Sequence, residues 1–413
     1  MRWLLIVTTL IVAFLLKYLF RRQHNNVCKT FEDYYTNRDT NPNCYNNPDV
    51  DLTIPEIVIN RGYPLETHRV TTDDNYILTI FRINHGKENI TGAKKTVLIV
   101  HGFGLNCGCF VTIGNKSLAF VLADNGYDVW LGNYRATIFS SHKYLNKADD
   151  LFWSFTLNEY VDYDMKNMIN FVYNATNRKI VFIGYSLSTA MFFTYSSKHV
   201  QHSLEKINVN VALAPVFNIR EWKSVFSYIP WNTLTKYIGT AVADYKVMNS
   251  YPLIQKYLCL PYPFQLKTCM LFYNLLEGWS NKQLDPETLP VSVIHNVDAT
   301  SFKVVHHLMQ LFRGNDGQWY DYGTKQNLEI YGTRKPIKTN LSNMKIPTYL
   351  LSANNDAIST PLNVELLYKN LTNAVKYKHV VEDDDFSHAD FFRGKDVFLL
   401  VYQHIIKFLE DFK

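Results

Sequence analysis

The chain of 413 residues is long enough to bury a large core, in one large domain or two smaller ones. Its 47% hydrophobic and 15% aromatic residues are typical of a globular protein and exclude a disordered or fibrous one. The net charge of +5 is mild, and the sequence has no zinc-ligand spacing, no P-loop motif and no basic helix with aromatic stacking positions. We therefore expect no nucleic acid partner, no metal and no organic cofactor.

The N-terminal segment, residues 1–26, has the composition of a targeting or anchoring sequence. An apolar run from Trp3 to Leu16 is followed by Lys17 and, a few residues later, by two arginines. Residues 3–20 are near the lower limit of length for crossing ~30 Å of hydrocarbon, and no small residues mark a cleavage site. We predict an uncleaved signal-anchor that contacts the membrane through residues 3–20, with a lumenal or extracellular body. The alternatives are a cleaved signal peptide, which would make the protein secreted or lysosomal, and a cytosolic chain.

Residues 27–60 are polar and show no periodicity, so we predict an arm that leads to the folded body. Six cysteines permit disulfides if the body is lumenal. The local pairs Cys28–Cys44 and Cys259–Cys269 are plausible bridges, whereas Cys107 and Cys109 are too close together for an easy bridge and fit small buried residues. The sequons are about as many as chance predicts for this composition, so they are compatible with a glycoprotein without arguing for one. They lie at Asn89, Asn115, Asn174, Asn340 and Asn370.

Buried strands and helices alternate along the next segment, residues 61–215. His68–Ile83 has the pattern of two strands joined by a turn at Asp73–Asn75. Thr96–Val100 is a continuous apolar run, the pattern of a strand that is buried on both faces of a parallel sheet. Further predicted elements are helices at Ser117–Asp124 and Tyr160–Tyr173 and strands at Tyr127–Leu131 and Ile180–Ile183.

This alternation breaks after Pro215 and resumes near residue 340. Residues 216–339 contain aromatic, proline-interrupted segments of helical length and no clear strand. We predict one α/β domain with a mostly parallel central sheet, built from residues 61–215 and 340–413, and interrupted after its sixth strand by a largely helical cap or lid, residues 216–339. The predicted elements of the last segment are strands at Thr348–Leu351 and Tyr377–Val381 and helices at Leu362–Lys369 and Val397–Leu409.

The stretch VFIGYSLSTA, Val181–Ala190, nearly matches the G-x-S-x-G motif of a nucleophile elbow. A serine hydroxyl becomes a strong nucleophile when a histidine takes its proton and a carboxylate orients that histidine. In α/β-hydrolase folds these groups follow sheet strands in the order serine, acid, histidine. Ser186, Asp356 and His388 follow predicted strands in that order. Each residue alone has an ordinary structural alternative, but together their types, order and placement predict a catalytic triad.

Two backbone amides are the candidates for an oxyanion hole. Leu187, directly after the serine, supplies one, and Phe103, in the loop after the strand Thr96–Val100, supplies the other. Ser188 stands where the motif has glycine, but it adds only a hydroxymethyl group, so we expect the elbow to tolerate it. His101 fits a structural turn histidine, and we assign no chemistry to it.

With these residues identified, the chain resembles the acid lipase family, which includes gastric and lysosomal acid lipases and many insect relatives. The resemblance covers about residues 55–412, nearly the whole body. Its most specific stretches are Arg61–Pro64, His101–Gly102 with the following loop, Asn115–Asn133, Phe152–Phe155, Tyr163–Asp164, Ala212–Pro215, Asn355–Asp356 and His388–Phe391.

The resemblance implies an α/β-hydrolase that hydrolyses triacylglycerols or sterol esters at a lipid–water interface, in an acidic lumenal or extracellular setting. It implies Ser186 as the nucleophile, Asp356 as the acid and His388 as the base, with oxyanion amides at Phe103 and Leu187. It also implies a cap disulfide, which Cys259 and Cys269 match in position and spacing.

The sequence departs from the family pattern in two places. The elbow is usually G-H-S-Q-G, whereas Tyr185, Leu187 and Ser188 replace the histidine, glutamine and last glycine here. The loop at Tyr134–Ala136 replaces a usual Ser-Arg-Gly. Both departures bear on efficiency and substrate preference more than on the type of reaction.

Two stretches of the predicted cap, Val225–Ile238 and Tyr251–Phe264, are rich in large apolar side chains broken by prolines. Such stretches either pack on the core or form a lid whose apolar patch meets lipid. In the second case we expect Phe226, Tyr228 and Trp231 to contact lipid. The rival enzymatic function is an esterase of smaller or different acyl substrates, and the rival from another class is a non-catalytic lipid-binding protein that retains the fold.

Overall fold

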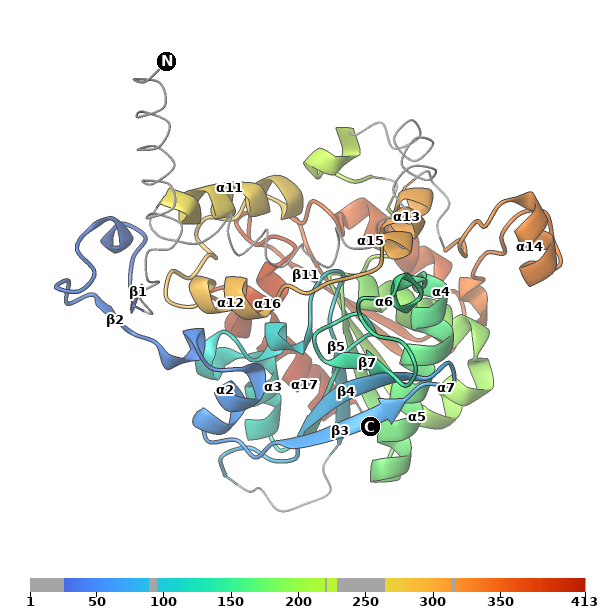
Figure 1. Ribbon diagram of the computed structural model, residues 1–413, viewed down its shortest axis with the longest axis horizontal. Coiled ribbons are helices and arrows are strands. Elements are labelled where there is room, and N and C mark those ends of the chain that lie inside the picture. The colour runs from blue at the N-terminus through green and yellow to red at the C-terminus, as the bar shows by residue number, and fades with distance from the viewer. Residues whose placement is uncertain (1–25, 89–94, 220, 229–263, 313–316, 413) are drawn as a thin grey trace.

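The centre of the molecule is a mostly parallel β-sheet, seen in a computed structural model that describes residues 26–88, 95–219, 221–228, 264–312 and 317–412 (Figure 1). Its main path follows the order β11-β10-β9-β8-β5-β6-β4-β3, and the short strand β7 pairs with β4. The strands from β11 to β6 are parallel, whereas β4 is antiparallel to β6, β3 and β7. In chain order the strands are β3 (Glu66–Thr71), β4 (Tyr76–Ile83), β5 (Thr96–Val100), β6 (Asp128–Gly132), β7 (Ser140–His142), β8 (Ile180–Tyr185), β9 (Ile207–Leu213), β10 (Thr348–Ala353) and β11 (Lys376–Val381).

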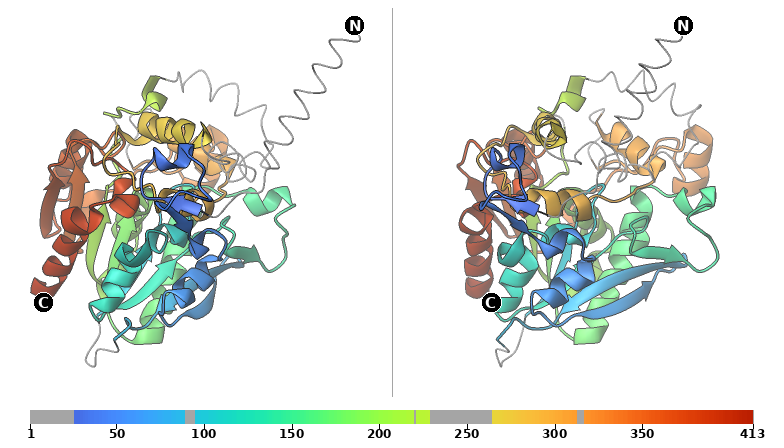
Figure 2. Two further views of the ribbon diagram at one scale, coloured as in Figure 1. Left: turned by 90° about the vertical axis from the view of Figure 1, so that its left-hand side faces the viewer. Right: turned by 60° about the vertical axis from the view of Figure 1, so that its left-hand side comes forward.

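Helices cover both faces of this sheet (Figures 1 and 2). Because successive side chains of a strand point to opposite faces, Leu98 and Val100 of β5 pack with one group of helices, α5, α6 and α15, while Val97 and Ile99 pack with the other, α2, α3 and α17. The helices outside the cap are α2 (Ile54–Asn60), α3 (Leu118–Asp124), α4 (Leu157–Glu159), α5 (Lys166–Thr176), α6 (Leu187–Lys198), α7 (Val200–Lys206), α15 (Pro361–Asn370), α16 (Asp390–Arg393) and α17 (Gln403–Asp411).

The predicted α/β fold with a mostly parallel sheet is confirmed, and most predicted elements are present with ends shifted by a few residues. The strand Thr96–Val100 has the predicted bounds, and every residue in it is buried. Asn75 adopts the left-handed conformation expected for the turn between β3 and β4, with φ +73°. The helix predicted at Tyr160–Tyr173 is part of a longer run in which a π-helical stretch, Tyr160–Met165, joins α4 to α5. The three-residue strand β7 was not predicted, so the insertion follows the seventh strand of the sheet in chain order and not the sixth.

The predicted arm, residues 27–60, contains a helix and two short strands that the sequence analysis did not identify. A capping box formed by Thr53 and Glu56 begins helix α2, which buries Ile54, Ile57 and Val58 in the core on one face of the sheet. Upstream, the two short strands β1 (Asn26–Cys28) and β2 (Cys44–Asn46) pair with each other, and Cys28 and Tyr34 pack against helices of the cap. The division of the chain into an arm over residues 27–60 and a body stays a prediction. The apolar spacing of α2 was present in the sequence, but a seven-residue helix is too short for its periodicity to stand out from polar neighbours.

Helices make up the cap wherever the structure describes it. These are α11 (Phe264–Glu277), α12 (Leu289–His295), α13 (Phe302–Leu311) and α14 (Thr324–Tyr331), and the described part of residues 216–339 contains no strand. Most of the two apolar stretches expected to meet lipid, including Trp231, lies outside the described residues, while the backbone of Phe226 and Tyr228 belongs to a short helical turn, Val225–Tyr228. The boundaries of the predicted segments stay predictions.

The cysteines agree with the local pairing where both partners are described. Cys28 and Cys44 form a disulfide that joins β1 to β2, which confirms that prediction. Cys107 and Cys109 are free and buried, as small core residues would be. Cys259 lies outside the described residues, so the Cys259–Cys269 bridge stays a prediction.

The segment predicted to be a signal-anchor or signal peptide, residues 1–26, lies outside the described residues apart from its last position. In the part of the chain that the structure does describe, no helix combines the length and the apolar character that membrane crossing requires.

Candidate active site

Ser186 lies on a sharp turn between strand β8 and helix α6. Its backbone has φ +53° and ψ −120°, a conformation that a non-glycine residue adopts only where the surrounding structure imposes it. The turn is held by the Ser186 N–H, which donates to the carbonyl oxygen of Leu213 at 2.9 Å on the neighbouring strand β9. A Cβ on Gly184 would lie 3.0 Å from the Phe182 ring and 3.3 Å from the backbone of Ser188, so this side of the elbow admits little more than glycine. The local geometry is that of a nucleophile elbow.

The three predicted triad side chains lie within hydrogen-bonding distance of one another. His388 Nε2 lies 2.8 Å from Ser186 Oγ, and His388 Nδ1 lies 2.8 Å from Asp356 Oδ2. Asp356 follows β10 and His388 follows β11, so parallel strands deliver all three groups to one edge of the sheet. The side chains are nearly enclosed, since the exposed fractions of Ser186, His388 and Asp356 are 8%, 4% and 1%.

The Asp356 carboxylate is fixed by its own backbone neighbours. Its Oδ1 accepts hydrogen bonds from the N–H groups of Ile358 at 2.8 Å and Ser359 at 2.7 Å, which leaves Oδ2 for the histidine. An ionised carboxylate in this place holds Nδ1–H of His388, so that Nε2 is free to accept the proton of the serine hydroxyl. The arrangement can therefore activate Ser186 for attack on an electrophilic carbon.

The two predicted oxyanion amides belong to segments next to Ser186. Leu187 is the first residue of α6, and Phe103 belongs to the loop after β5. Within the described part of the chain, neither backbone N–H donates a hydrogen bond. A Cβ on Gly102 would lie 3.0 Å from the Cβ of Ser186, so glycine at this position lets the Phe103 loop pass close to the nucleophile.

His101 is a buried structural residue beside this loop. Its Nδ1–H donates to the carbonyl oxygen of Gly102 at 2.9 Å, and its Nε2 accepts the backbone N–H of Tyr134 at 3.3 Å. Burial lowers the pKa of His101 to about 4, so the ring is neutral at ordinary pH. This pattern fits the structural reading of His101 and requires no chemical role for it.

Sequence reasoning missed Glu277, at the C-terminal end of cap helix α11. Its carbonyl oxygen accepts the N–H of Ala357 at 3.1 Å and the N–H of His388 at 3.3 Å, so it joins the loop after β10 to the loop after β11. Its carboxylate accepts a hydrogen bond from Arg393 Nη2 at 2.6 Å, and burial raises the pKa of Glu277 against the opposing effect of Arg393 and His388. Nothing local in the sequence marks this contact, since the partners are far apart along the chain.

The departures from the family elbow are accommodated by contacts of their own. The Tyr185 ring lies 5.4 Å from the His388 ring, and its hydroxyl donates to the carbonyl oxygen of His388 at 3.2 Å. The Ser188 hydroxyl is fully buried and lies 3.1 Å from the hydroxyl of Tyr134. The tolerance expected for Ser188 thus has a structural reason, because the added hydroxyl has a partner.

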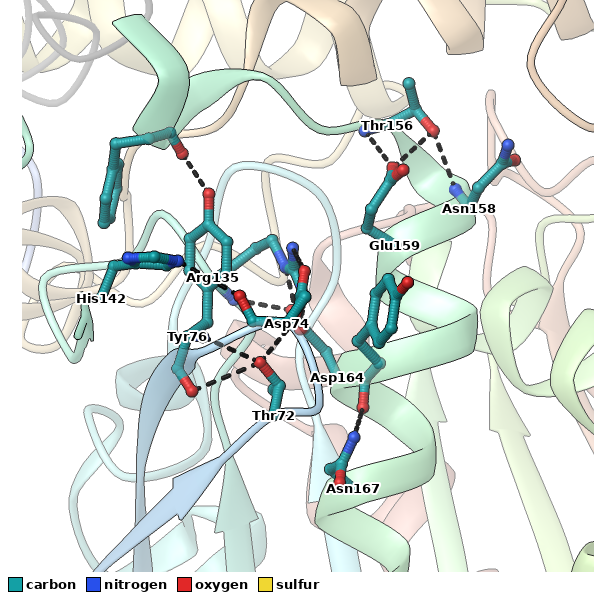
Figure 3. A network of polar contacts seen from close by, with 12 residues as sticks. Thr72, Asp74, Tyr76, Arg135, His142, Thr156, Asn158, Glu159, Asp164 and Asn167 are labelled. Atoms are coloured by element: carbon teal, nitrogen blue, oxygen red, sulfur yellow. Dashed lines mark hydrogen bonds and ion pairs between the residues drawn. The ribbon is translucent and has the colours of Figure 1, made fainter. Parts of the chain in front are cut away.

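A buried ion network anchors the loop after β6 (Figure 3). The Arg135 guanidinium contacts the Asp164 carboxylate at 2.7 and 2.9 Å and the Asp74 carboxylate at 2.7 and 3.0 Å, and it lies 4.0 Å from the Tyr76 ring. Asp164 also accepts the backbone N–H of Arg135 at 2.9 Å. Burial raises the pKa of Asp164 to about 6, with Arg135 opposing it. The network fixes the position of the residue before Arg135, which is Tyr134.

No group of three or more metal-ligating side chains is present among the residues that the structure describes.

Comparison with known proteins places the chain in a family. The family described as a partial α/β-hydrolase lipase region matches residues 54–114, and the family described as the α/β hydrolase fold matches residues 95–243. Lipase member N of Mus musculus is 32% identical over 379 residues, which cover 89% of this chain and 92% of that protein. Gastric triacylglycerol lipase of Bos taurus is 30% identical over 377 residues, which cover 89% of this chain and 93% of that protein. A solved esterase from Pyrococcus furiosus superposes with a TM-score of 0.46 at 15% identity, covering 86% of this chain and 94% of the esterase.

The class of protein follows from the fold and these relatives: the chain is a carboxylic-ester hydrolase with the α/β-hydrolase fold. It belongs to the acid lipase family that its motifs resemble, and lipid ester hydrolysis is the activity of that family.

Proposed function

We propose that the protein hydrolyses triacylglycerols or sterol esters through an acyl intermediate on Ser186, with His388 as the base and Asp356 as the acid. The observation that carries this proposal is the continuous hydrogen-bonded row from Ser186 Oγ through His388 to Asp356, with 2.8 Å on each side of the imidazole. Two further observations support the same assignment: the positive φ of Ser186, and the two nearby backbone N–H groups that donate no hydrogen bond within the described part of the chain.

The reaction follows from the positions of these groups. Ser186 Oγ attacks the ester carbonyl carbon while His388 Nε2 takes its proton, and the N–H groups of Phe103 and Leu187 donate to the oxyanion that forms. The carbon–alkoxide bond then breaks, and the imidazolium returns the proton to the departing alcohol. A water molecule attacks the acyl-enzyme with His388 again as base, and release of the fatty acid restores the serine hydroxyl.

A lipid substrate at an interface is supported by the cap surface. Tyr228 is 84% exposed, Trp279 is 53% exposed, and Leu271 and Leu275 of α11 are also exposed. Trp279 follows the end of α11, and Tyr228 belongs to the turn Val225–Tyr228 that contacts α11. Exposed apolar side chains gathered in one region are typical of a surface that meets lipid or another protein. An esterase of short acyl substrates would have less use for such a surface, so we favour a lipase.

We also propose that the folded body resides in the secretory pathway, either anchored through residues 3–20 or released after cleavage. The Cys28–Cys44 disulfide supports an oxidising compartment.

Fluorophosphonate labelling with mass spectrometry of the modified peptide tests the mechanism. We expect an adduct on Ser186 that is absent in Ser186→Ala and greatly reduced in His388→Ala. Asp356→Asn should keep the backbone contacts of the carboxylate yet lower kcat about a thousandfold or more, because the amide favours the wrong histidine tautomer.

Each labelling reaction is repeated with lipid or detergent, which separates a closed lid from a site without reactivity. No adduct under either condition on a folded sample would overturn the proposal in favour of a non-catalytic lipid-binding protein. Hydrolysis rates on triacylglycerols and sterol esters of increasing acyl length then define the substrate, and activity confined to short soluble esters would exclude a lipase.

A further inference from the structure

Tyr134 contacts the structures on both sides of the nucleophile. Its backbone N–H donates to His101 Nε2 at 3.3 Å, and its hydroxyl lies 3.1 Å from the hydroxyl of Ser188. The three residues are buried, with exposed fractions of 2% for Tyr134, 2% for His101 and 0% for Ser188. A buried polar contact without competing water holds its partners in a defined geometry.

The first contact leads to the amide of Phe103. His101 donates from Nδ1 to the carbonyl oxygen of Gly102 at 2.9 Å. That carbonyl and the N–H of Phe103 belong to one planar peptide unit, so fixing the direction of the oxygen also fixes the direction of the N–H. Tyr134 completes this relay, because its own N–H occupies Nε2 and leaves Nδ1 as the donor.

The second contact leads to the amide of Leu187. Ser188 is the second residue of α6, and Leu187 is the first, so the Tyr134 hydroxyl holds the first turn of this helix. Both amides are thus tied to one side chain and its backbone.

Tyr134 is itself fixed from two directions. Its ring stacks on the Tyr160 ring with centroids 4.5 Å apart and planes 6° apart. The next residue, Arg135, is held by Asp164 through both its backbone N–H and its guanidinium. A residue held in this way stays in one place and therefore keeps the groups bonded to it, His101 and Ser188, in one place as well.

We propose that Tyr134 is a positioning residue that sets the two oxyanion amides relative to each other, a role that rests on the proposed Ser186 mechanism. The Tyr134–Ser188 pair replaces the small residues of the usual family pattern at both positions, so the two departures act as one unit. Loss of the hydroxyl contact loosens the first turn of α6 without removing either amide.

The test compares Tyr134→Phe, Ser188→Ala and the double variant in the full-length protein, on a soluble short-chain ester that needs no lipid surface. Loss of a whole oxyanion donor lowers kcat about 10²- to 10³-fold, so we expect about a tenfold loss for a loosened one, with KM within about twofold of wild type. The double variant should match either single variant, because both remove the same contact. Binding of a boronic acid that forms a tetrahedral adduct on Ser186 should weaken in parallel with kcat, since it uses the same amides.

Tyr160→Phe is the matched control. It removes a buried hydroxyl, which contacts Thr300 at 3.3 Å, from the ring stacked on Tyr134 and keeps the stack itself. We expect wild-type kcat and boronic acid affinity for this variant. Thermal midpoints are measured for every variant, and if Tyr134→Phe is poorly folded, Ser188→Ala carries the comparison, since it removes a single oxygen atom.

The outcomes separate this inference from the function on which it rests. If wild-type protein hydrolyses the ester and is labelled at Ser186, but Tyr134→Phe and Ser188→Ala retain full kcat or lose activity additively, the inference is overturned and the function stands. A loss in KM alone, or an equal loss in Tyr160→Phe, also overturns it. If wild-type protein neither hydrolyses the ester nor labels at Ser186, the proposed function and this inference fail together.

Discussion

Replacement of His307 should change how the stability of the protein depends on pH. His307 lies on α13 and is 3% exposed. Its Nε2–H donates to the carbonyl oxygen of Gln318 at 2.9 Å, and its Nδ1 has no partner in the described part of the chain. Burial, with a smaller contribution from the neighbouring His306, lowers the pKa of His307 to about 4, against the opposing effect of the hydrogen bond to Gln318. Protonation would create a buried charge with no acceptor for the new N–H.

The magnitude follows from proton linkage. In the unfolded chain the imidazole takes a proton near its ordinary pKa of about 6.5, whereas the folded protein takes it only near 4. The unfolded state therefore binds more protons as the pH falls, and folding loses stability between these two values. The loss from this one group amounts to about 1 kcal/mol by pH 5.5 and to about 2 kcal/mol by pH 4.5, relative to pH 7.

The assay is urea unfolding of wild type and His307→Gln at pH 7.0, 5.5 and 4.5, followed by tryptophan fluorescence. Glutamine places an amide near the former Nε2, so the contact with Gln318 can persist while the titration is removed. We expect the variant to have a lower free energy of unfolding than wild type at pH 7. Between pH 7 and pH 4.5 the free energy of unfolding should fall by about 2 kcal/mol more in wild type than in the variant. His306→Gln on the same helix controls for loss of an imidazole. A difference between wild type and His307→Gln that stays constant with pH would refute the reasoning.

Substitutions of Gly278 and Arg135 test other buried contacts, and Gly332 serves as a control position for Gly278. Gly278 has φ +115°, and a Cβ on it would lie 2.4 Å from the carbonyl oxygen of Asn355, whereas Gly332, with φ +71°, has nothing within 4 Å of such a Cβ. Gly278→Ala should therefore lower the free energy of unfolding by about 2–4 kcal/mol and lower kcat. Gly332→Ala should lower the free energy of unfolding by about 1 kcal/mol and leave kcat unchanged. Equal effects of the two in unfolding and kinetic assays would contradict the close approach. Arg135→Met leaves Asp164 buried without its cation and should cost about 3–5 kcal/mol at pH 7.5. The cost should shrink at pH 5, where Asp164 binds a proton, and a pH-independent cost in urea titrations would count against the ion network.

The parts of the fold that the sequence predicted are those with strong local signals. Thr96–Val100 is apolar at every position because both faces are covered, and the run ends where the strand ends. The elbow is equally local, since a few residues set the turn between β8 and α6. The placement of Ser186, Asp356 and His388 after the strands β8, β10 and β11 was also predictable, because parallel strands bring their ends to one edge of the sheet.

The parts that sequence could not predict depend on contacts between distant segments. The small size of Ser188 was recognised, but its partner Tyr134 is reached only through the fold. Glu277 lies 80 residues or more from the groups that its carbonyl joins, so no local pattern marks it. Helix α2 was not predicted because it has only seven residues, and the contacts of Cys28 and Tyr34 with the cap join segments that are far apart along the chain.

The carbonyl oxygen of Glu277 has a consequence for how this protein can be engineered or can diverge. This one atom of the cap accepts hydrogen bonds from the backbone of both the loop after β10 and the loop after β11. A cap taken from another lipase would place a different residue at the end of α11, and the positions of these two loops would change with it. Exchange of substrate specificity between relatives should therefore succeed when the cap is transplanted together with the loops around Ala357 and His388, and fail when it is transplanted alone. The cap and these two loops therefore have to change together, although they lie in different segments of the chain.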